Sequence, residues 1–167
     1  LKIKFRESFR PFAPSVMVEH ADEWFDLRGH ESPYMLLVAD VLPHRLRTLT
    51  GEEKAAQGFD KLKVVRSEIP AVTHVDNSAR IQTVRREDNP AYHALLDAFR
   101  RKTGCPVLIN TSFNVRGEPI VRTPEEAYTC FMRTHMDFLC LGGYVLDKTE
   151  QAPWKDEFGW KAEFELD

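Results

Sequence analysis

Four polar residues that directly follow a short apolar run are the part of the chain best suited to chemistry. The apolar run covers residues 106–109, comes after Gly104 and predicts a short buried strand. The polar residues are, in chain order, Asn110, Thr111, Ser112 and Asn114. Their short side chains donate and accept hydrogen bonds without long flexible stems. At a strand end in an α/β sheet they would bind a polar ligand, or they form an Asx/Ser turn that satisfies itself.

Basic residues supply the counterpart for a negatively charged ligand. Lys4 and Arg6 are two positions apart in an alternating segment, so an extended chain directs both side chains to one face. Arg80 follows a polar turn and is a third candidate. Arginine binds phosphate bidentately, and lysine binds it as a point charge. With Ser112 and Asn114, these cations predict a site for a phosphate-bearing ligand. The alternative for Lys4 and Arg6 is an edge strand kept soluble by its charges.

This set of side chains favours reactions that need alignment and charge neutralisation. Ser112 and Asn114 would donate hydrogen bonds to a phosphoryl or carbonyl oxygen on which charge develops. Adenylate formation is such a reaction, because it depends on positioning more than on proton transfer. The site therefore requires no general base.

A metal site has weak support in the sequence. Cys130, His135 and Cys140 lack the Cys-x-x-Cys pair that is typical of zinc sites. Both cysteines fall in apolar segments, which favours core thiols over metal ligands. No metal ligand is therefore assigned in this chain.

Other catalytic motifs are weak or missing. The sequence has no Walker phosphate-binding loop and no Gly-x-Gly-x-x-Gly pattern. A Ser112 nucleophile with His74 as its base lacks the nucleophile-elbow sequence. His135 and Asp137 follow a predicted helix, where a role in satisfying the helix end is favoured over catalysis.

Length and charge indicate a single globular domain and argue against some classes of partner. The chain has 167 residues, the size of one globular domain, and its 23 Lys+Arg against 26 Asp+Glu give a formal net charge of -3. That balance argues against a polyanionic partner, so any basic site is local. Three cysteines are typical of a reducing compartment, and no apolar run is long enough for a membrane helix. We expect a cytoplasmic domain that has been cut from a longer protein.

Two helices have clear start signals. Asn89 as N-cap and Pro90 predict a helix that ends at Gly104, with an apolar stripe. The stripe consists of Tyr92, Leu95, Leu96 and Phe99. Thr123, Pro124 and Glu126 predict a capping box and a second helix that buries its apolar side chains. Those side chains are Ala127, Cys130 and Phe131.

The remaining elements are predicted from apolar runs. Residues 15–19, 34–39, 138–141 and 144–146 read as strands, and the run at 34–39 is typical of a buried one. Residues 71–84 read as two short β-prone pieces around a polar turn, and residues 20–25 as a short helix. Residues 42–69 are expected to form a long surface excursion. The aromatic-rich residues 149–167 are expected to form a C-terminal arm laid against the body.

Several motifs in one order carry a resemblance to a known family. They are Lys-Phe-Arg-Glu at 4–7, Arg-Pro-Phe-Ala-Pro at 10–14, His-Val-Asp at 74–76, Ala-Arg-Ile-Gln-Thr-Val at 79–84, Asn-Thr-Ser-Phe-Asn-x-Arg-Gly-Glu-Pro-Ile-Val at 110–121, and Thr-Pro-Glu-Glu-Ala at 123–127. Together they resemble the C-terminal domain of the nodulation-type O-carbamoyltransferases over most of the chain. Asn77 and Ser78 stand where that pattern has Gly-Thr, a change within a turn that leaves Arg80 in place.

The resemblance implies a fold and a set of site residues. The fold is α/β (α+β-like), a twisted mixed sheet with flanking helices, similar to the YrdC-like fold of threonylcarbamoyl-adenylate synthases and the hydrogenase-maturation carbamoyltransferase. The shared Lys-x-Arg and Ser-x-Asn signature implies catalytic roles for Lys4, Arg6, Ser112 and Asn114. These four would also bind the nucleotide and carbamoyl phosphate. Further binding residues implied in this way are Arg80, Asn110, Thr111 and Arg116.

The same resemblance implies a reaction and a partner domain. The substrates would be ATP, carrying Mg²⁺, and carbamoyl phosphate, from which the domain would make a carbamoyl-adenylate with release of pyrophosphate. An N-terminal domain of the actin-like ATPase superfamily, holding its own metal, would pass the carbamoyl group to an acceptor hydroxyl. Residues 1–167 would then be a single YrdC-like domain, separated from that larger part.

Two other interpretations compete with an enzymatic function. The first is a YrdC-type RNA-binding module, which requires a broad basic stripe with stacking aromatics and is disfavoured by the negative net charge. The second is a scaffold domain that only docks the larger domain. The complete Lys-x-Arg and Ser-x-Asn signature argues against a scaffold, because nothing else requires these four polar groups.

Overall fold

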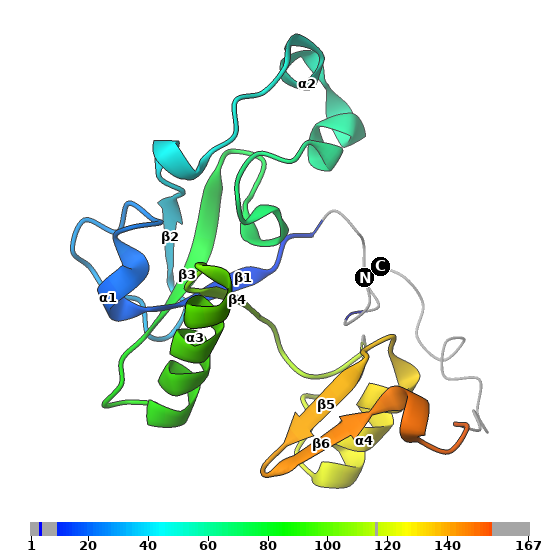
Figure 1. Cartoon of the computed structure of the whole chain (residues 1–167). Helices are drawn as coiled ribbons and strands as arrows, with labels where there is room; N and C mark the ends of the chain where they lie inside the picture. The colour runs from blue at the N-terminus through cyan, green and yellow to red at the C-terminus, as the bar shows by residue number, and fades with distance from the viewer. Residues whose placement is uncertain (1–3, 5–9, 116, 155–167) are drawn as a thin grey trace. The chain divides into compact units, whose positions relative to one another are not determined.

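The chain forms two compact units. The computed structural model describes residues 4, 10–115 and 117–154. Pro11–Thr111 form one unit, named here the sheet unit, and the described residues of Leu1–Arg10 and Ser112–Asp167 form the other, named the hairpin unit. Figure 1 shows both units. Whether residues 1–167 act as a single domain stays a prediction.

The sheet unit is built on four strands in the order β2-β3-β1-β4 (Figure 1). The strands are β1 Ala13–Met17, β2 Leu37–Asp40, β3 Ser78–Val84 and β4 Val107–Asn110. Strand β1 pairs with β3 in parallel and with β4 antiparallel, and β2 pairs antiparallel with β3. The sheet is therefore mixed and flanked by helices, so the predicted α/β (α+β-like) class is confirmed.

The main core lies on one face of this sheet. Val16 from β1, Ile81 from β3 and Val107 from β4 pack there. Trp24 and Phe25 cover them from the segment after the short helix α1, Val18–Ala21. Alternation along the strands sends Arg80 and Gln82 of β3 to the opposite face.

Helix α3, Pro90–Thr103, packs on the opposite face of the sheet through Leu96. Its predicted start and end are confirmed. The Asn89 side chain accepts from the N–H of Tyr92 at 3.1 Å, and Gly104 ends the helix with a φ of 78°. The apolar stripe predicted for this helix included more side chains than the sheet covers. Leu96 is 0% exposed whereas Leu95 is 55% exposed. The other buried side chain of helix α3 is His93.

Residues 34–39 were predicted as a buried strand. A strand is present over part of this run, but the predicted burial was wrong. Strand β2 begins only at Leu37, and Tyr34 and Leu36 before it are 82% and 79% exposed. The reason is that β2 is an edge strand, paired on one side only, and of its apolar side chains only the small Ala39 packs against the main core. Apolar composition alone does not distinguish an edge strand from a central one.

Residues 42–69 form the predicted surface excursion, with short helical turns. These are 3₁₀ turns at Pro43–Arg45 and Gly58–Lys63 and helix α2, Gly51–Ala55, whose capping box is complete at Thr50 and Glu53. The expected first β piece of residues 71–84 is instead part of a 3₁₀ turn, Pro70–Val72, and only β3 is a strand. Asn77 before β3 has a φ of 70°, a left-handed conformation that asparagine tolerates.

The hairpin unit combines helix α4, Pro124–Arg133, with strands β5, Phe138–Leu141, and β6, Tyr144–Asp147 (Figure 1). A 3₁₀ turn at Lys148–Glu150 follows. Helix α4 buries its predicted side chains, which are Ala127, Cys130 and Phe131. Only one of the two hydrogen bonds of the predicted capping box is formed at the start of α4. Thr123 accepts from the N–H of Glu126 at 3.2 Å, but the Glu126 carboxylate accepts from the backbone N–H of Arg122.

The predicted C-terminal arm, 149–167, is described only as far as residue 154. Within that part, the Trp154 ring meets the Tyr128 ring of α4 edge-on, with ring centroids 6.3 Å apart. Residues 155–167 lie outside the described part of the chain. No helix among the described residues is long and apolar enough to cross a lipid bilayer.

Candidate functional site

Three of the predicted site residues meet in the hairpin unit. The Lys4 ammonium, although 108 positions away in the chain, donates to the Ser112 hydroxyl oxygen at 3.0 Å. It also donates to the backbone carbonyl of Asn114 at 2.9 Å and to the Asn114 side-chain oxygen. Lys4 is 9% exposed, so this lysine is held inside the unit. These contacts fix a cation against the Ser-x-Asn segment.

The Asn114 side chain has a defined orientation. Its Oδ1 accepts from Lys4 and, at 2.7 Å, from the Ser112 hydroxyl. Its Nδ2 donates to the carbonyl oxygen of Glu118 at 2.7 Å. Since only the amide nitrogen can donate, the oxygen of Asn114 must face Lys4 and Ser112. Ser112, Asn114 and Glu118 are thus joined by their own polar groups into one loop segment.

An ion pair attaches this loop to helix α4. The guanidinium of Arg133, in the last turn of α4, pairs with the Glu118 carboxylate, and both side chains are largely buried. Sequence reasoning did not find this pair. Its signal was weak, because a glutamate after a glycine and an arginine near a helix end are common surface residues.

Further cations of the hairpin unit lie near the buried Cys130. Burial raises the pKa of the Cys130 thiol and Glu118 raises it further, whereas Lys4, Arg133 and Lys148 oppose that rise. The Lys148 ammonium donates to the backbone carbonyls of Phe131 and Thr134 and lies 4.3 Å from the centroid of the Phe131 ring. Lys148 therefore closes the C-terminal end of α4, the favourable end of a helix for a cation.

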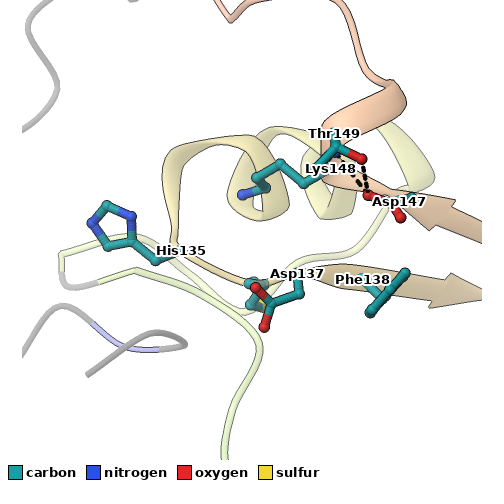
Figure 2. A pocket seen from close by; sticks show the side chains of 7 residues that line it. His135, Asp137, Phe138, Asp147, Lys148 and Thr149 are labelled. Atoms are coloured by element: carbon teal, nitrogen blue, oxygen red, sulfur yellow. Dashed lines mark hydrogen bonds between the residues drawn. The ribbon is translucent and has the colours of Figure 1, made fainter.

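An open cavity of about 780 Å³ lies at this end of α4. His135, Asp137, Phe138, Asp147, Lys148 and Thr149 are labelled among its lining residues in Figure 2. Figure 2 also shows Lys148 extended beside the end of α4, and Asp147 hydrogen-bonded to Thr149. His135 and Asp137, which the sequence placed after this helix, both line the cavity. Ser112 and Asn114 do not line it.

The sheet unit carries a second group of polar side chains. Arg80 is exposed on β3, and Asn110 ends β4. Two residues beyond Arg80, Gln82 accepts hydrogen bonds from Ser15 and Asn110. At the start of β3, the Ser78 hydroxyl donates to Asp76 at 2.7 Å. This and a backbone hydrogen bond hold the pKa of Asp76 below its usual range.

The predicted site residues therefore fall into three sets. Lys4, Ser112 and Asn114 form one cluster in the hairpin unit. Arg80, Asn110 and Thr111 belong to the sheet unit. Arg6 and Arg116 lie outside the described residues. His74, considered as a base for Ser112, has its Nδ1 2.9 Å from the Ser78 hydroxyl. The catalytic and binding roles assigned to all these residues stay predictions.

The cysteines differ from the expectation of core thiols. Cys130 is buried, but Cys140 is exposed, because its strand β5 belongs to a two-stranded sheet with an open face. Among the described residues, no three histidine, cysteine, aspartate or glutamate side chains gather in a way that could hold a metal ion.

The exposure difference predicts selective alkylation. In the native chain, iodoacetamide should modify Cys140 at least about tenfold faster than Cys130, because Cys130 is buried and burial raises its thiol pKa. Peptide mass spectrometry after timed quenching measures both rates. In urea the two cysteines should react alike, and equal rates in the native chain would contradict the described packing of α4.

Comparison with known proteins identifies the family of the chain. Residues 1–148 match the model of the carbamoyltransferase C-terminus. The chain belongs to that family. Among its relatives are an uncharacterized protein of Synechocystis, 58% identical over the whole chain, and the nodulation protein NolNO of Sinorhizobium fredii, 42% identical over 90% of the chain. A 3'-hydroxymethylcephem-O-carbamoyltransferase of Amycolatopsis lactamdurans is 40% identical over 72% of the chain.

The chain spans only a small part of these relatives. It covers 27% of the Synechocystis protein, 20% of NolNO and 19% of the cephem O-carbamoyltransferase. The predicted family is therefore confirmed, and the chain corresponds to one part of proteins several times longer.

Proposed function

We propose that this carbamoyltransferase C-terminal domain forms a carbamoyl-adenylate from ATP and carbamoyl phosphate. The observation that carries the proposal is the cluster of Lys4, Ser112 and Asn114, in which a largely buried ammonium lies against a hydroxyl and an amide. An ammonium with adjacent hydrogen-bonding groups suits a reaction at phosphoryl and carbonyl oxygens. Membership of the carbamoyltransferase family supports the carbamoyl group as the one transferred.

The reaction balances with one water molecule. Water cleaves carbamoyl phosphate into carbamate and inorganic phosphate. A carbamate oxygen then attacks the α-phosphorus of ATP, and the bond from that phosphorus to the bridging oxygen of pyrophosphate breaks. The products are carbamoyl-adenylate, pyrophosphate and inorganic phosphate. In both steps negative charge is rearranged on phosphoryl oxygens, so positioned donors and a cation lower the barrier.

Each residue of the cluster has a distinct role in this proposal. Lys4 neutralises charge on the carbamoyl and phosphoryl oxygens. Ser112 and Asn114 hold the ammonium in place, and the second N–H of the Asn114 amide, beside the one that bonds Glu118, is the donor for the same oxygens. Arg6 and Arg116 keep the phosphate-binding roles that the family signature implies.

The sheet unit supplies the remaining proposed contacts. Arg80 binds phosphate, and Asn110 and Thr111 donate or accept hydrogen bonds at the ligand. Exposure of the Arg80 side chain is consistent with access to an anionic ligand. Mg²⁺ enters with ATP, coordinated by phosphate oxygens as is usual for nucleotide sites.

Transfer to the final acceptor is assigned to the rest of the longer protein. Relatives of which this chain covers about a fifth include proteins named as O-carbamoyltransferases. We infer that an N-terminal domain of the actin-like ATPase superfamily, with its own metal, receives the carbamoyl-adenylate and passes the carbamoyl group to an acceptor hydroxyl.

Exchange of labelled pyrophosphate into ATP tests the adenylation step. The chain should catalyse exchange only when carbamoyl phosphate is present, because only then is there an adenylate that pyrophosphate can reverse. A Ser112→Ala, Asn114→Ala double variant should lose at least about a hundredfold of that rate. Thr149→Ala is the matched control, since it removes an exposed hydroxyl of the same unit, which donates to Asp147 and has no contact with the cluster among the described residues. Exchange independent of carbamoyl phosphate, or unchanged in a folded double variant, would overturn the proposal.

A further inference from the structure

Gln82, which sequence reasoning did not single out, links three strands of the sheet unit. Its Oε1 accepts from the Ser15 hydroxyl of β1 at 2.7 Å and from Nδ2 of Asn110 on β4. Its Nε2 donates to the backbone carbonyl of Pro33 at 3.1 Å. Since Ser15 and Pro33 hold Gln82 from two other segments, its position does not depend on Asn110.

These hydrogen bonds determine which way the Asn110 amide points. A carbonyl oxygen accepts about two hydrogen bonds, and Gln82 Oε1 already has two donors. Only the nitrogen of Asn110 can donate to it, so Nδ2 faces Gln82. The oxygen Oδ1 of Asn110 is then directed elsewhere as an acceptor, and among the described residues no hydrogen bond to it is formed.

Gln82 also lies close to Arg80, the residue of this unit that is proposed to bind phosphate. Arg80 is two residues before Gln82 on β3, so both side chains leave the same face of the sheet. Helix α3 covers the far end of that face, where Leu96 packs on Met17 and Val84. Arg80 is exposed and Asn110 is half-buried, so both can contact a ligand from this face.

We propose that Gln82 is a positioning residue that directs Oδ1 of Asn110 at an NH₂ group of a substrate. This inference rests on the proposed function, in which Asn110 contacts the ligand. Both proposed substrates carry such a donor, namely the 6-amino group of adenine and the amide of the carbamoyl group. An acceptor fixed in this way distinguishes a substrate with an NH₂ group from an analogue without it.

The test compares substrates with analogues that lack only the NH₂ group. Purine riboside triphosphate replaces ATP without the 6-amino group, and acetyl phosphate replaces the NH₂ of carbamoyl phosphate by a methyl group. Each pair has nearly the same charge, so the ratio of the two dissociation constants reports the NH₂ contact alone. The unmodified chain should prefer one natural substrate by about tenfold, the loss expected for one hydrogen bond. Which pair shows the preference identifies the source of the NH₂ group.

Gln82→Met should reduce this preference to less than about twofold, and so should Asn110→Ala. The double variant should be no worse than either single variant, because Gln82 acts through Asn110. Thr83→Val is the matched control. It removes a buried hydroxyl on the other face of β3 that accepts from Ser32 N–H at 2.9 Å, and it should lower stability without changing the preference. Gln82→Leu, which likewise cannot accept from Asn110, replaces Gln82→Met if that variant does not fold.

The failures of the two proposals are distinguishable. If the unmodified chain binds neither ATP nor carbamoyl phosphate, the proposed function fails and this inference fails with it. If the chain catalyses carbamoyl-phosphate-dependent exchange but shows no preference for the NH₂ group, the proposed function stands and the role of Gln82 is overturned. Equal loss of preference in Gln82→Met and Thr83→Val also overturns it, because a general structural effect would then explain both.

Discussion

Replacing Lys4 by methionine is expected to lower carbamoyl-phosphate-dependent exchange of pyrophosphate into ATP by at least about a hundredfold. Methionine keeps much of the side-chain volume but removes the ammonium that donates to Ser112 and Asn114. The reaction then loses both a cation and the anchor of the Ser-x-Asn loop. Initial exchange rates at saturating ATP and carbamoyl phosphate measure the effect.

Lys63→Met is the matched control for this variant. Lys63 is an exposed lysine of the sheet unit that pairs with Asp60 at 2.8 Å, so its loss removes the same charge without touching the cluster. Its exchange rate should stay within about twofold of the unmodified chain, since exposed ion pairs contribute little. Circular dichroism confirms that both variants are folded. A folded Lys4→Met chain with undiminished exchange would remove Lys4 from the mechanism.

Replacing Leu96 by alanine is expected to lower the free energy of unfolding of the sheet unit by about 2–5 kcal/mol. Leu96 is 0% exposed and packs between helix α3 and the strands at Met17 and Val84. Removing its methyl groups loses apolar burial and leaves a cavity. Urea unfolding followed by far-ultraviolet circular dichroism measures the change, with the slope compared between variants.

The neighbouring leucine provides the control. Leu95 has the same composition and lies on the same helix, but it is 55% exposed, so Leu95→Ala should cost less than about 1 kcal/mol. Equal losses for the two variants would show that α3 packs with a different face against the sheet than the one described.

Local chemistry made helices α3 and α4 predictable, whereas α1 covers Val18–Ala21 and not the expected residues 20–25. Asn89 and Gly104 mark the ends of α3, and Thr123 with Pro124 marks the start of α4, because caps act through backbone groups of the same few residues. Strand β4 and the hairpin strands β5 and β6 were also predicted from short apolar runs. The failures concern burial. Leu36, Leu95 and Cys140 are exposed. Their burial was predicted wrongly because the local sequence does not indicate which side of an element other segments cover.

The candidate site was predictable only in part, for a similar reason. Lys4, Ser112 and Asn114 were found as residue types suited to phosphate, and the structure brings them together. Gln82 and the pair of Glu118 with Arg133 were missed. Their roles arise from hydrogen bonds and ion pairs between segments far apart in the chain, which no short motif encodes.

Direct detection of the adenylate is the measurement closest to the central claim. The chain is mixed with Mg-ATP and carbamoyl phosphate labelled with ¹³C in the carbamoyl group, quenched within seconds, and analysed by mass spectrometry. The proposed function predicts a labelled carbamoyl-adenylate, with pyrophosphate and inorganic phosphate released in equal amounts, and none of these from the Ser112→Ala, Asn114→Ala variant. Recovery of intact ATP, or of ADP with no labelled adenylate, from a folded chain would contradict it.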